Sequence, residues 1–304
     1  MRSARLLVVA LCLAAAPSTS WAYAESGGVF DVGFAALPPT RPGGVVSLEY
    51  DSLDQGKDWS GARRASYAAN PDKDIGTEFF TGAIRYMVDP SWGFEISAPV
   101  ARRHLVTTDE HGVVGGADNG AIGDIRARGV YSGFSPGMSS GLTFGLKLPT
   151  GPFRTPDFAR DSQIGAGGTD LLLGAYHKGR IATGGAWSWF SNGAWDEPLL
   201  DSGGYRPGAE IDAALGAAYD GWSVGGLRVA PFAQAVGTLR WRDLGTSADP
   251  ADSGYRRVLL SPGLEVSMGA FRASGDADFP VYQFVDGNQL VASELYRLSV
   301  GWSF

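Results

Sequence analysis

The sequence predicts an all-β protein, a transmembrane antiparallel up-and-down β-barrel of about 12 strands. Three observations predict it. Apolar and polar residues alternate with the period of two typical of a strand that has one apolar face. Past residue 24, no apolar run approaches the ~18 residues of a membrane-spanning helix. The expected strands are joined alternately by short turns and long polar loops, as in outer-membrane barrels. Because 44% of the residues are hydrophobic, the composition excludes a disordered chain.

Residues 1–24 are expected to be a cleaved secretion signal. Arg2 and Arg5 precede the apolar stretch 6–16, and Ala22-Tyr23-Ala24 fits a cleavage site. The one cysteine, Cys12, lies inside this signal, so the mature chain is expected to lack disulfides, thiolate metal sites and cysteine nucleophiles. Removing two of the 25 basic residues and none of the 32 acidic residues leaves a formal charge of −9, which argues against nucleic acid as a partner.

Residues 25–44 form a tail ahead of the barrel, which is expected to span residues 45–304. The tail contains Val32, Phe34 and Leu37 and then a run rich in proline and glycine at 38–44. Its apolar residues could fold into the lumen as a plug, lie in the periplasm or add a strand. We expect a short tail that lies in the periplasm or enters the lumen.

Twelve strands are expected along the remaining chain. Their centres are 46–51, 79–88, 92–100, 122–134, 141–149, 169–176, 183–192, 209–219, 227–242, 255–266, 270–282 and 295–304. Short connections follow the even strands, at 89–91, 135–137, 177–179, 220–222 and 268–269, and long polar ones follow odd strands, as at 54–76, 102–120, 151–168 and 243–254. This alternation places the short turns and both chain ends on the periplasmic side and the long loops outside the cell.

The parity of each strand separates a lipid face from an inner face. In the strand at 141–149, Leu142, Phe144, Leu146 and Leu148 are expected to face lipid, and the residues between them face inward. Charged residues share the inward parity of several strands, so the lumen is expected to be wet or crossed by salt bridges. Tryptophans near strand ends fit an interfacial girdle; they are Trp92, Trp187, Trp189, Trp222, Trp241 and Trp302.

Register across the tightest turns predicts two structural ion pairs. Arg85 is expected opposite Glu95, and Glu265 opposite Arg272. Opposite charges across a ladder contribute about 0.2 to 1 kcal/mol and require no solute.

The same rule places like charges together in the next hairpin, where Arg126 faces Lys147. Like charges across a ladder are destabilising. Either protein carboxylates neutralise them or the level attracts a passing anion and acts as a constriction. The candidates at this level are Asp124, Arg126, Arg128, Lys147 and Asp170.

A second charged level is expected where Arg240, Arg242 and Arg257 approach Glu210 and Asp212. Such mixed charges either form a salt-bridge belt that narrows a pore or create a transverse field that orients polar solutes. The sequence leaves both interpretations open.

The last strand carries an assembly signal. Tyr296, Leu298, Val300, Trp302 and Phe304 alternate with smaller or polar residues and end the chain. This ending resembles the C-terminal signal of Gram-negative outer-membrane barrels, which implies recognition by the outer-membrane assembly machinery.

Three segments resemble a known outer-membrane family. They are Gly-Asp-Ile-Arg at 123–126, Gly-Leu-Thr-Phe-Gly-Leu-Lys-Leu-Pro-Thr-Gly at 141–151 and Gly-Thr-Asp-Leu-Leu-Leu-Gly at 168–174. Together they are similar to the family of phenol meta-pathway transporters. The resemblance covers roughly residues 75 to 180, and it implies an outer-membrane pore linked to aromatic (phenol) degradation without naming a ligand.

We therefore expect an outer-membrane channel in a Gram-negative cell for passive, substrate-restricted passage of small solutes, with aromatic or hydrophobic compounds as candidates. The alternative is a closed structural or adhesion-type barrel without transport. The expected partners are membrane lipid, lipopolysaccharide, the assembly machinery and a small-molecule solute, and the barrel is expected to be a monomer.

Catalysis is not expected, nor is a metal site or a cofactor. An outer-face lipid hydrolase would need a Ser and His arrangement. His104 is the one candidate by position, and neither Ser nor Asn stands two residues away. Contact of Arg102, Arg103 and His104 with lipopolysaccharide phosphates is the favoured interpretation.

Overall fold

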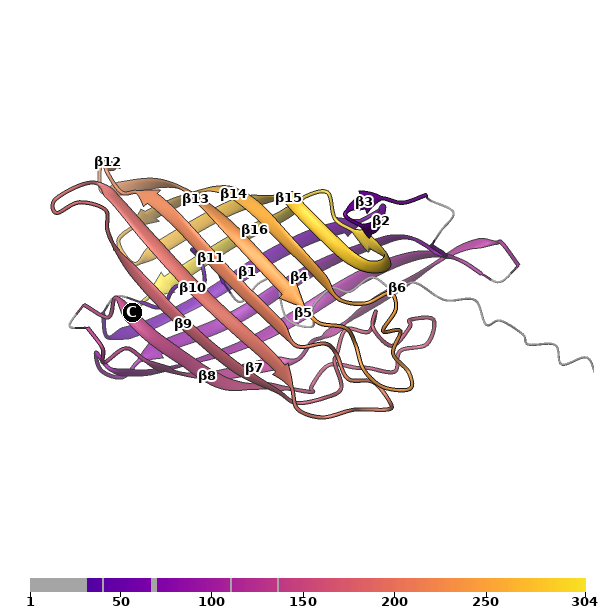
Figure 1. The fold of residues 1–304 in the computed structure, drawn as a ribbon. Helices are drawn as coiled ribbons and strands as arrows, with labels where there is room; N and C mark the ends of the chain where they lie inside the picture. Colours follow the sequence, from indigo (N-terminus) through magenta and orange to yellow (C-terminus); the bar gives the residue numbers. More distant parts are fainter. Residues whose placement is uncertain (1–31, 40, 67–69, 110, 136) are drawn as a thin grey trace, which may run out of the picture.

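The structure is a computed structural model that describes residues 32–39, 41–66, 70–109, 111–135 and 137–304. These residues form a closed antiparallel barrel (Figure 1). Its twelve wall strands are β1 (Gly43–Gln55), β4 (Asp72–Met87), β5 (Trp92–Thr108), β7 (Ile125–Tyr131), β8 (Ser140–Leu148), β9 (Asp170–Arg180), β10 (Trp187–Pro198), β11 (Glu210–Tyr219), β13 (Leu227–Arg240), β14 (Tyr255–Met268), β15 (Phe271–Val291) and β16 (Leu295–Ser303). Four further strands extend the wall: β2 (Lys57–Gly61), β3 (Arg63–Arg64), β6 (Val114–Ile122) and β12 (Trp222–Val224).

The first and last strands close the barrel. Leu48 of β1 pairs with Gly82 of β4 on one side and with Val300 of β16 on the other. Every consecutive pair of wall strands is antiparallel, so the expected up-and-down barrel of twelve strands is confirmed. In the described part of the chain, no helix is long and apolar enough to cross a bilayer.

The outer face is apolar because alternate residues of each strand point away from the axis. Leu142, Phe144, Leu146 and Leu148 are all exposed on this face, whereas Lys147 between them is buried inside. The short connections and the C-terminus lie at one end of the barrel, and the long loops lie at the other (Figure 1).

Two predicted turns are misplaced. β9 continues through 177–179 to Arg180, which still pairs with Ser188, so the connection lies at 181–186 and the next strand is β10 rather than 183–192. The chain also passes through 220–222 into β12, which pairs with β13, and it turns at Gly225 and Gly226 instead. Both of these glycines have positive φ (59° and 85°), which the tight hairpin turn requires and other residues adopt reluctantly.

Two predicted loops are largely strand. β5 and β6 form a long hairpin over most of 102–120, and β2 within 54–76 pairs with the extension of β15. Strands with polar side chains can continue to form backbone hydrogen bonds beyond the lipid. The hydrophobic pattern therefore underestimated the length of these strands.

The predicted strand 122–134 is interrupted by a β-bulge. Ile122 pairs with Val100 while Arg126 pairs with Ser97, so the strand that contains Gly123 and Asp124 has one residue more than β5. The bulge changes the direction of the chain at Asp124, whose position matters for the lumen.

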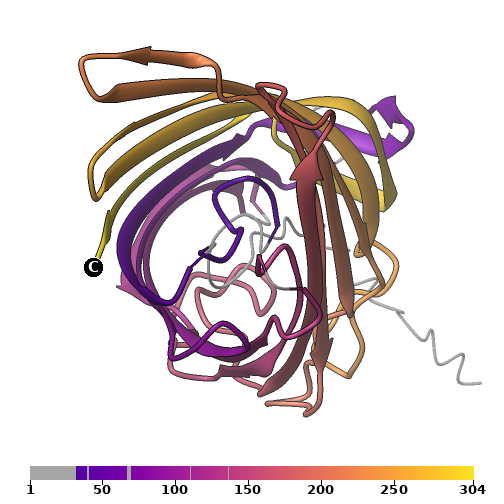
Figure 2. The same cartoon turned by 90° about the vertical axis from the view of Figure 1, so that its left-hand side faces the viewer.

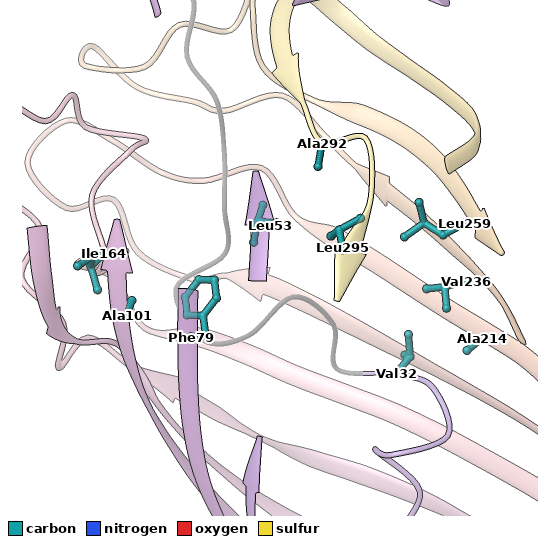
Figure 3. Close-up of a cluster of buried hydrophobic side chains, with 10 residues drawn as sticks. All are labelled: Val32, Leu53, Phe79, Ala101, Ile164, Ala214, Val236, Leu259, Ala292 and Leu295. Atoms are coloured by element: carbon teal, nitrogen blue, oxygen red, sulfur yellow. The ribbon is translucent and has the colours of Figure 1, made fainter. Parts of the chain in front are cut away.

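The barrel interior contains an apolar cluster in addition to its charges (Figure 3). Val32 comes from the tail and Ile164 from the connection between β8 and β9, and both are fully buried. The connection between β15 and β16 supplies Ala292, and wall strands supply the other members, which are Leu53, Phe79, Ala101, Ala214, Val236, Leu259 and Leu295. The expectation of a lumen that is wet or crossed by salt bridges is therefore incomplete, because apolar side chains of the wall and of two inserted segments also pack inside the barrel.

Candidate functional site

The candidate site is the lumen, and its first component is the tail segment 32–39, which lies inside the barrel (Figure 2). Wall side chains bind its backbone. Asn192 accepts a hydrogen bond from the Gly33 N–H (3.1 Å) and donates one to the Gly33 carbonyl (3.0 Å), and Gln234 accepts one from the Phe34 N–H (2.9 Å). Such contacts satisfy the backbone of a segment that has no strand partner.

Aromatic contacts hold the same segment. The Phe34 ring stacks on Phe232 with a centroid distance of 4.6 Å and an interplanar angle of 20°, and it lies 5.3 Å from the tilted ring of Phe190. Phe190 and Phe232 are buried, whereas most aromatic rings of this protein face lipid. The wall therefore has an inward aromatic pair that receives the tail.

Cationic side chains bind the rest of the tail. Arg85 donates to the Ala35 carbonyl (2.9 Å), and Lys178 donates to the Pro38 carbonyl (2.8 Å). The tail thus contacts wall strands on several sides of the lumen, and its passage narrows the barrel at the short-turn end.

Two cavities border the tail. One, of about 90 Å³, is lined by Arg126, Arg128 and Glu95 among others. The other, of about 330 Å³, lies between the tail and the wall formed by β1, β14, β15 and β16. Glu49 and Arg85 line both cavities, so the two spaces adjoin.

The expected pairing of Arg85 opposite Glu95 is confirmed, and the pair extends into a network. The Arg85 Nε binds one oxygen of Glu95, and the Arg128 Nη1 lies 3.2 Å from the other. One carboxylate therefore bridges two guanidinium groups beside the smaller cavity.

Glu265 and Arg272 also form an ion pair, at 3.2 Å, although the expected register is wrong. Glu265 lies opposite Ser274, and Arg272 lies opposite Ser267. The turn is one residue later than expected, and this moves the register by two. The long Arg272 side chain still reaches Glu265 diagonally across the ladder.

Arg126 does lie opposite Lys147, as expected. The Lys147 ammonium binds Asp170 at 2.5 Å and Asp196 at 2.8 Å, and the side chains of Lys147 and Asp170 are almost completely buried. Protein carboxylates therefore bind one of the two like charges, which is one of the two alternatives that the sequence left open.

Asp124 has a further role that the sequence did not predict, because it binds a connection between two wall strands. Its carboxylate is fully buried and accepts hydrogen bonds from the N–H groups of Gly151 (2.9 Å) and Ala166 (2.8 Å). It thereby anchors the connection 149–169, which folds into the mouth of the barrel. The anchored ends are so close that a Cβ on Gly165 would lie 2.2 Å from the Gly151 carbonyl oxygen.

Arg103 also holds this inserted connection, and its expected contact with lipopolysaccharide is wrong. Its side chain is buried and points inward, where Nη1 donates to the carbonyls of Ser162 (2.6 Å) and Gln163 (3.2 Å). Strand alternation sends Arg103 inward while its neighbours Arg102 and His104 point outward.

The structure brings together some of the residues expected at the second charged level. Arg240 lies 3.8 Å from Glu210 and 2.5 Å from Asp243, a residue that sequence reasoning missed. Asp212 accepts a hydrogen bond from the Thr238 hydroxyl (2.6 Å). These groups are buried together inside the outer half of the wall.

The two remaining arginines that were expected at this level differ in position. Arg257 lies on the inner face with its guanidinium 5.0 Å from the centre of the Tyr255 ring. Arg242, in contrast, is exposed and pairs with Asp286 at 3.1 Å, and this pairing raises the pKa of the Arg242 guanidinium. Its expected place is wrong because β13 ends at Arg240, after which strand parity no longer applies.

The sequence analysis did not predict the roles of two other acidic residues inside the barrel. Arg297 of β16 pairs with Asp51 of β1 at 3.3 Å. The inward parity of Asp51 was a usable signal, but the pairing depends on how the first strand meets the last. In the inserted connection, burial and the nearby charge of Asp243 raise the pKa of Asp161 well above its usual range.

The end of the chain contributes to closure. The Phe304 N–H donates to the Gly44 carbonyl (2.9 Å), and the Gly44 N–H donates back to the Phe304 carbonyl (2.8 Å). Tyr296 and Trp302 are exposed on the lipid face, as their parity predicts. Their role in assembly stays a prediction.

The outer face holds one serine–histidine contact that the sequence did not suggest. Ser140 Oγ lies 2.5 Å from His177 Nδ1, and the ring of Trp189 lies 5.0 Å from the imidazole. His104 contacts Asp118 at 2.8 Å. Across the described ranges, no group of three or more His, Cys, Asp or Glu side chains could hold a metal ion.

Comparison with known proteins supports the fold. No family model matches the chain, and no curated protein matches it. An outer membrane channel from Pseudomonas putida F1 is similar in structure, with a TM-score of 0.64 and 13% identity over 88% of this chain and 97% of that one. The beta domain of the Bordetella autotransporter Brka is also similar, with a TM-score of 0.51 and 12% identity over 86% of this chain and 100% of that one. At such identities the likeness concerns the fold, and these two neighbours differ in what they do.

Proposed function

We propose that this chain is a channel of the Gram-negative outer membrane for passive, substrate-restricted passage of small solutes, exported with residues 1–24 as a cleaved signal. The observation that carries this proposal is the pair of adjoining cavities beside the tail, inside a closed wall with an apolar outer face. A barrel that serves only as a structural element has no need of charged internal cavities.

The dimensions favour small solutes. Twelve strands enclose a narrower lumen than the 16 to 18 strands of general porins. The tail and the connection 149–169 narrow it further, down to a cavity of about 90 Å³. A solute that passes must be small or must displace one of these two segments.

Apolar side chains inside the barrel, outside the lining of the two cavities, favour solutes with an apolar part. The buried pair Phe190 and Phe232 and the apolar cluster of Figure 3 offer contacts to an aromatic or aliphatic group. Aromatic or hydrophobic compounds, including the phenols suggested by the family resemblance, are therefore the proposed substrate class.

Two charged levels are proposed to select among solutes. The lower constriction consists of Arg126, Arg128 and Lys147 with the carboxylates that bind or flank them, Asp124 and Asp170. The upper one contains Glu210, Asp212, Arg240 and Arg257. Removing the charges of Arg126 and Lys147 by substitution with alanine should change ion selectivity, and unchanged selectivity and conductance would exclude this level as a filter.

Reconstitution in planar bilayers with phenols, aromatic acids and sugars tests the channel itself. Conductance with selective block by one of these classes supports it. The alternative is a closed structural or adhesion-type barrel, and the two segments that fill the lumen favour it. It predicts that protein shown to be inserted in the bilayer has no conductance.

The proposed partners follow from where the residues lie on the barrel. The apolar outer face contacts membrane lipid, and Arg102 and His104 at its outer edge are proposed to contact lipopolysaccharide. The C-terminal strand with Tyr296, Trp302 and Phe304 is proposed to be recognised by the assembly machinery. We propose a monomer, which sedimentation in detergent tests.

A further inference from the structure

The larger cavity has a charge opposite to that of the whole chain. Among its lining residues are four arginines and two glutamates, a formal excess of two positive charges, although the protein carries a formal charge of −7. The charged lining residues are Arg41, Glu49, Arg85, Arg228, Glu265 and Arg272. Such a local inversion in a concave space concentrates anions.

Ion pairing with Glu95, which lies outside the lining, offsets the charge of Arg85 and reduces this excess, but the ion pairs do not remove it. Arg272 lies 3.2 Å from Glu265, and Arg228 is close enough to interact with the same carboxylate, so two guanidinium groups share one negative charge. Each of these groups is held in place, and the charges therefore remain together without an ion.

Hydroxyl groups complete the lining. Five serines from four wall strands face this cavity, namely Ser47, Ser267, Ser274, Ser299 and Ser303. One of them, Ser267, accepts a hydrogen bond from the Arg228 Nε at 3.4 Å. Guanidinium groups bind carboxylate or phosphate oxygens through paired N–H donors, and hydroxyl groups add single donors around them.

We propose that this cavity, which we call the basic vestibule, binds a small organic dianion of the dicarboxylate or phosphomonoester type. Its volume of about 330 Å³ lies at the lower end of the range for small-molecule sites, about 300 to 1,000 Å³. The site adjoins the short turn at Gly269 and Ala270, so the bound anion lies at the mouth that the barrel topology assigns to the periplasm.

The inference rests on the proposed function only for the periplasmic location of the site. Binding of the anion itself requires no transport. Succinate is the probe, and succinamide, which has the same length and no charge, is its control. Isothermal titration of the full chain in a zwitterionic detergent at low salt should show saturable one-site binding of succinate and none of succinamide. Since screening acts on such contacts, salt at about 0.5 M should weaken the binding.

Substitutions of arginines that line the basic vestibule test whether succinate binds there. Replacing Arg228 and Arg272 together with glutamine should weaken succinate binding about tenfold or more, because charge-assisted hydrogen bonds are lost. Arg242→Gln is the matched control, since Arg242 is exposed at the other end of the barrel beside Asp286, and it should bind succinate like the wild type. If the double variant does not fold, as judged by heat-modifiable mobility on a gel, Arg41→Gln replaces it, because Arg41 is exposed and precedes the first strand.

Absence of saturable binding, equal binding of succinamide, or wild-type affinity in the folded variant would each overturn the proposal. Conductance of the same preparation separates this failure from that of the channel. Conductance without succinate binding contradicts the basic vestibule alone, whereas binding without conductance contradicts the channel alone.

Discussion

Replacing Phe34 with alanine should loosen the tail inside the lumen and open the channel. The substitution removes the ring that stacks on Phe232 and contacts Phe190, and it leaves the backbone hydrogen bonds of Gly33 and Phe34 in place. A completely buried phenylalanine loses about 3 to 5 kcal/mol on truncation to alanine. Phe34 is only partly buried, so we expect a loss near the lower limit, about 2 to 3 kcal/mol.

This loss has a direct consequence for conductance. Every 1.4 kcal/mol changes a population about tenfold, so the fraction of barrels with an undocked tail should rise about 30- to 140-fold. Single-channel recordings in planar bilayers should show more frequent transitions to a higher conductance level. The backbone contacts slow complete withdrawal, so the openings should be transient.

Phe94→Ala is the matched control, because Phe94 is an aromatic residue exposed on the lipid face. It removes a ring of equal size without touching the tail, and its recordings should match those of the wild type. If Phe34→Ala inserts normally and its openings are no more frequent than those of Phe94→Ala, the tail does not restrict passage and the reasoning is wrong.

Two further substitutions and one deletion test the parts of the lumen and its closure. Lys147→Met leaves the buried Asp170 without this cation and should lower the free energy of unfolding by about 3 to 5 kcal/mol, measured by urea titration with tryptophan fluorescence. Gly165→Val places side-chain atoms where the Gly151 carbonyl lies, so the inserted connection should leave the mouth and conductance should rise without loss of the barrel. Deleting Phe304 removes the last backbone contacts to β1 and should reduce the folded fraction in membranes, read from heat-modifiable gel mobility.

Each of these expectations has its own control. Adding Asp170→Asn to Lys147→Met should restore part of the lost stability, and a complete lack of recovery would mean that the charge pair is not the cause. Gly137→Val should leave conductance unchanged, since no atom lies within 4 Å of the added Cβ there. Phe304→Trp should assemble normally, and a failure equal to that of the deletion would point to a requirement for phenylalanine itself.

Strand period and parity predicted much of the wall. Twelve strands and the lipid face of β8 follow from the alternation of side chains, which is a local property. The opposition of Arg126 and Lys147 follows from that alternation together with the position of the turn between their strands. The register of Glu265 and Arg272 failed by two residues because it depends on the position of one turn. Parity also placed Arg103 inward, so its expected contact with lipopolysaccharide could have been rejected from the sequence.

The filling of the lumen was much harder to predict. Nothing local shows that the connection 149–169 turns inward, because its anchor, Asp124, is separated from Ala166 by more than forty residues. The tail was left with several alternatives for the same reason. A possible signal was the inward parity of Phe190 and Phe232, since a ring on the wet side of a barrel requires an apolar contact.

The two inserted segments differ in how they are held, and this difference predicts which one moves. The connection 149–169 is bound at both ends to the wall, and the buried carboxylate of Asp124 fixes its base through two N–H groups. Among the described residues, the segment 32–39 is held by hydrogen bonds from several wall side chains and by the contacts of the Phe34 ring, and its residues line both cavities. A solute in these cavities reaches the tail, whereas the Asp124 anchor of the connection is completely buried, so the tail should respond to a solute before the connection does. A solute that inserts its apolar group between Phe190 and Phe232 would compete directly with Phe34, and passage would then depend on the same pair of rings that closes the lumen.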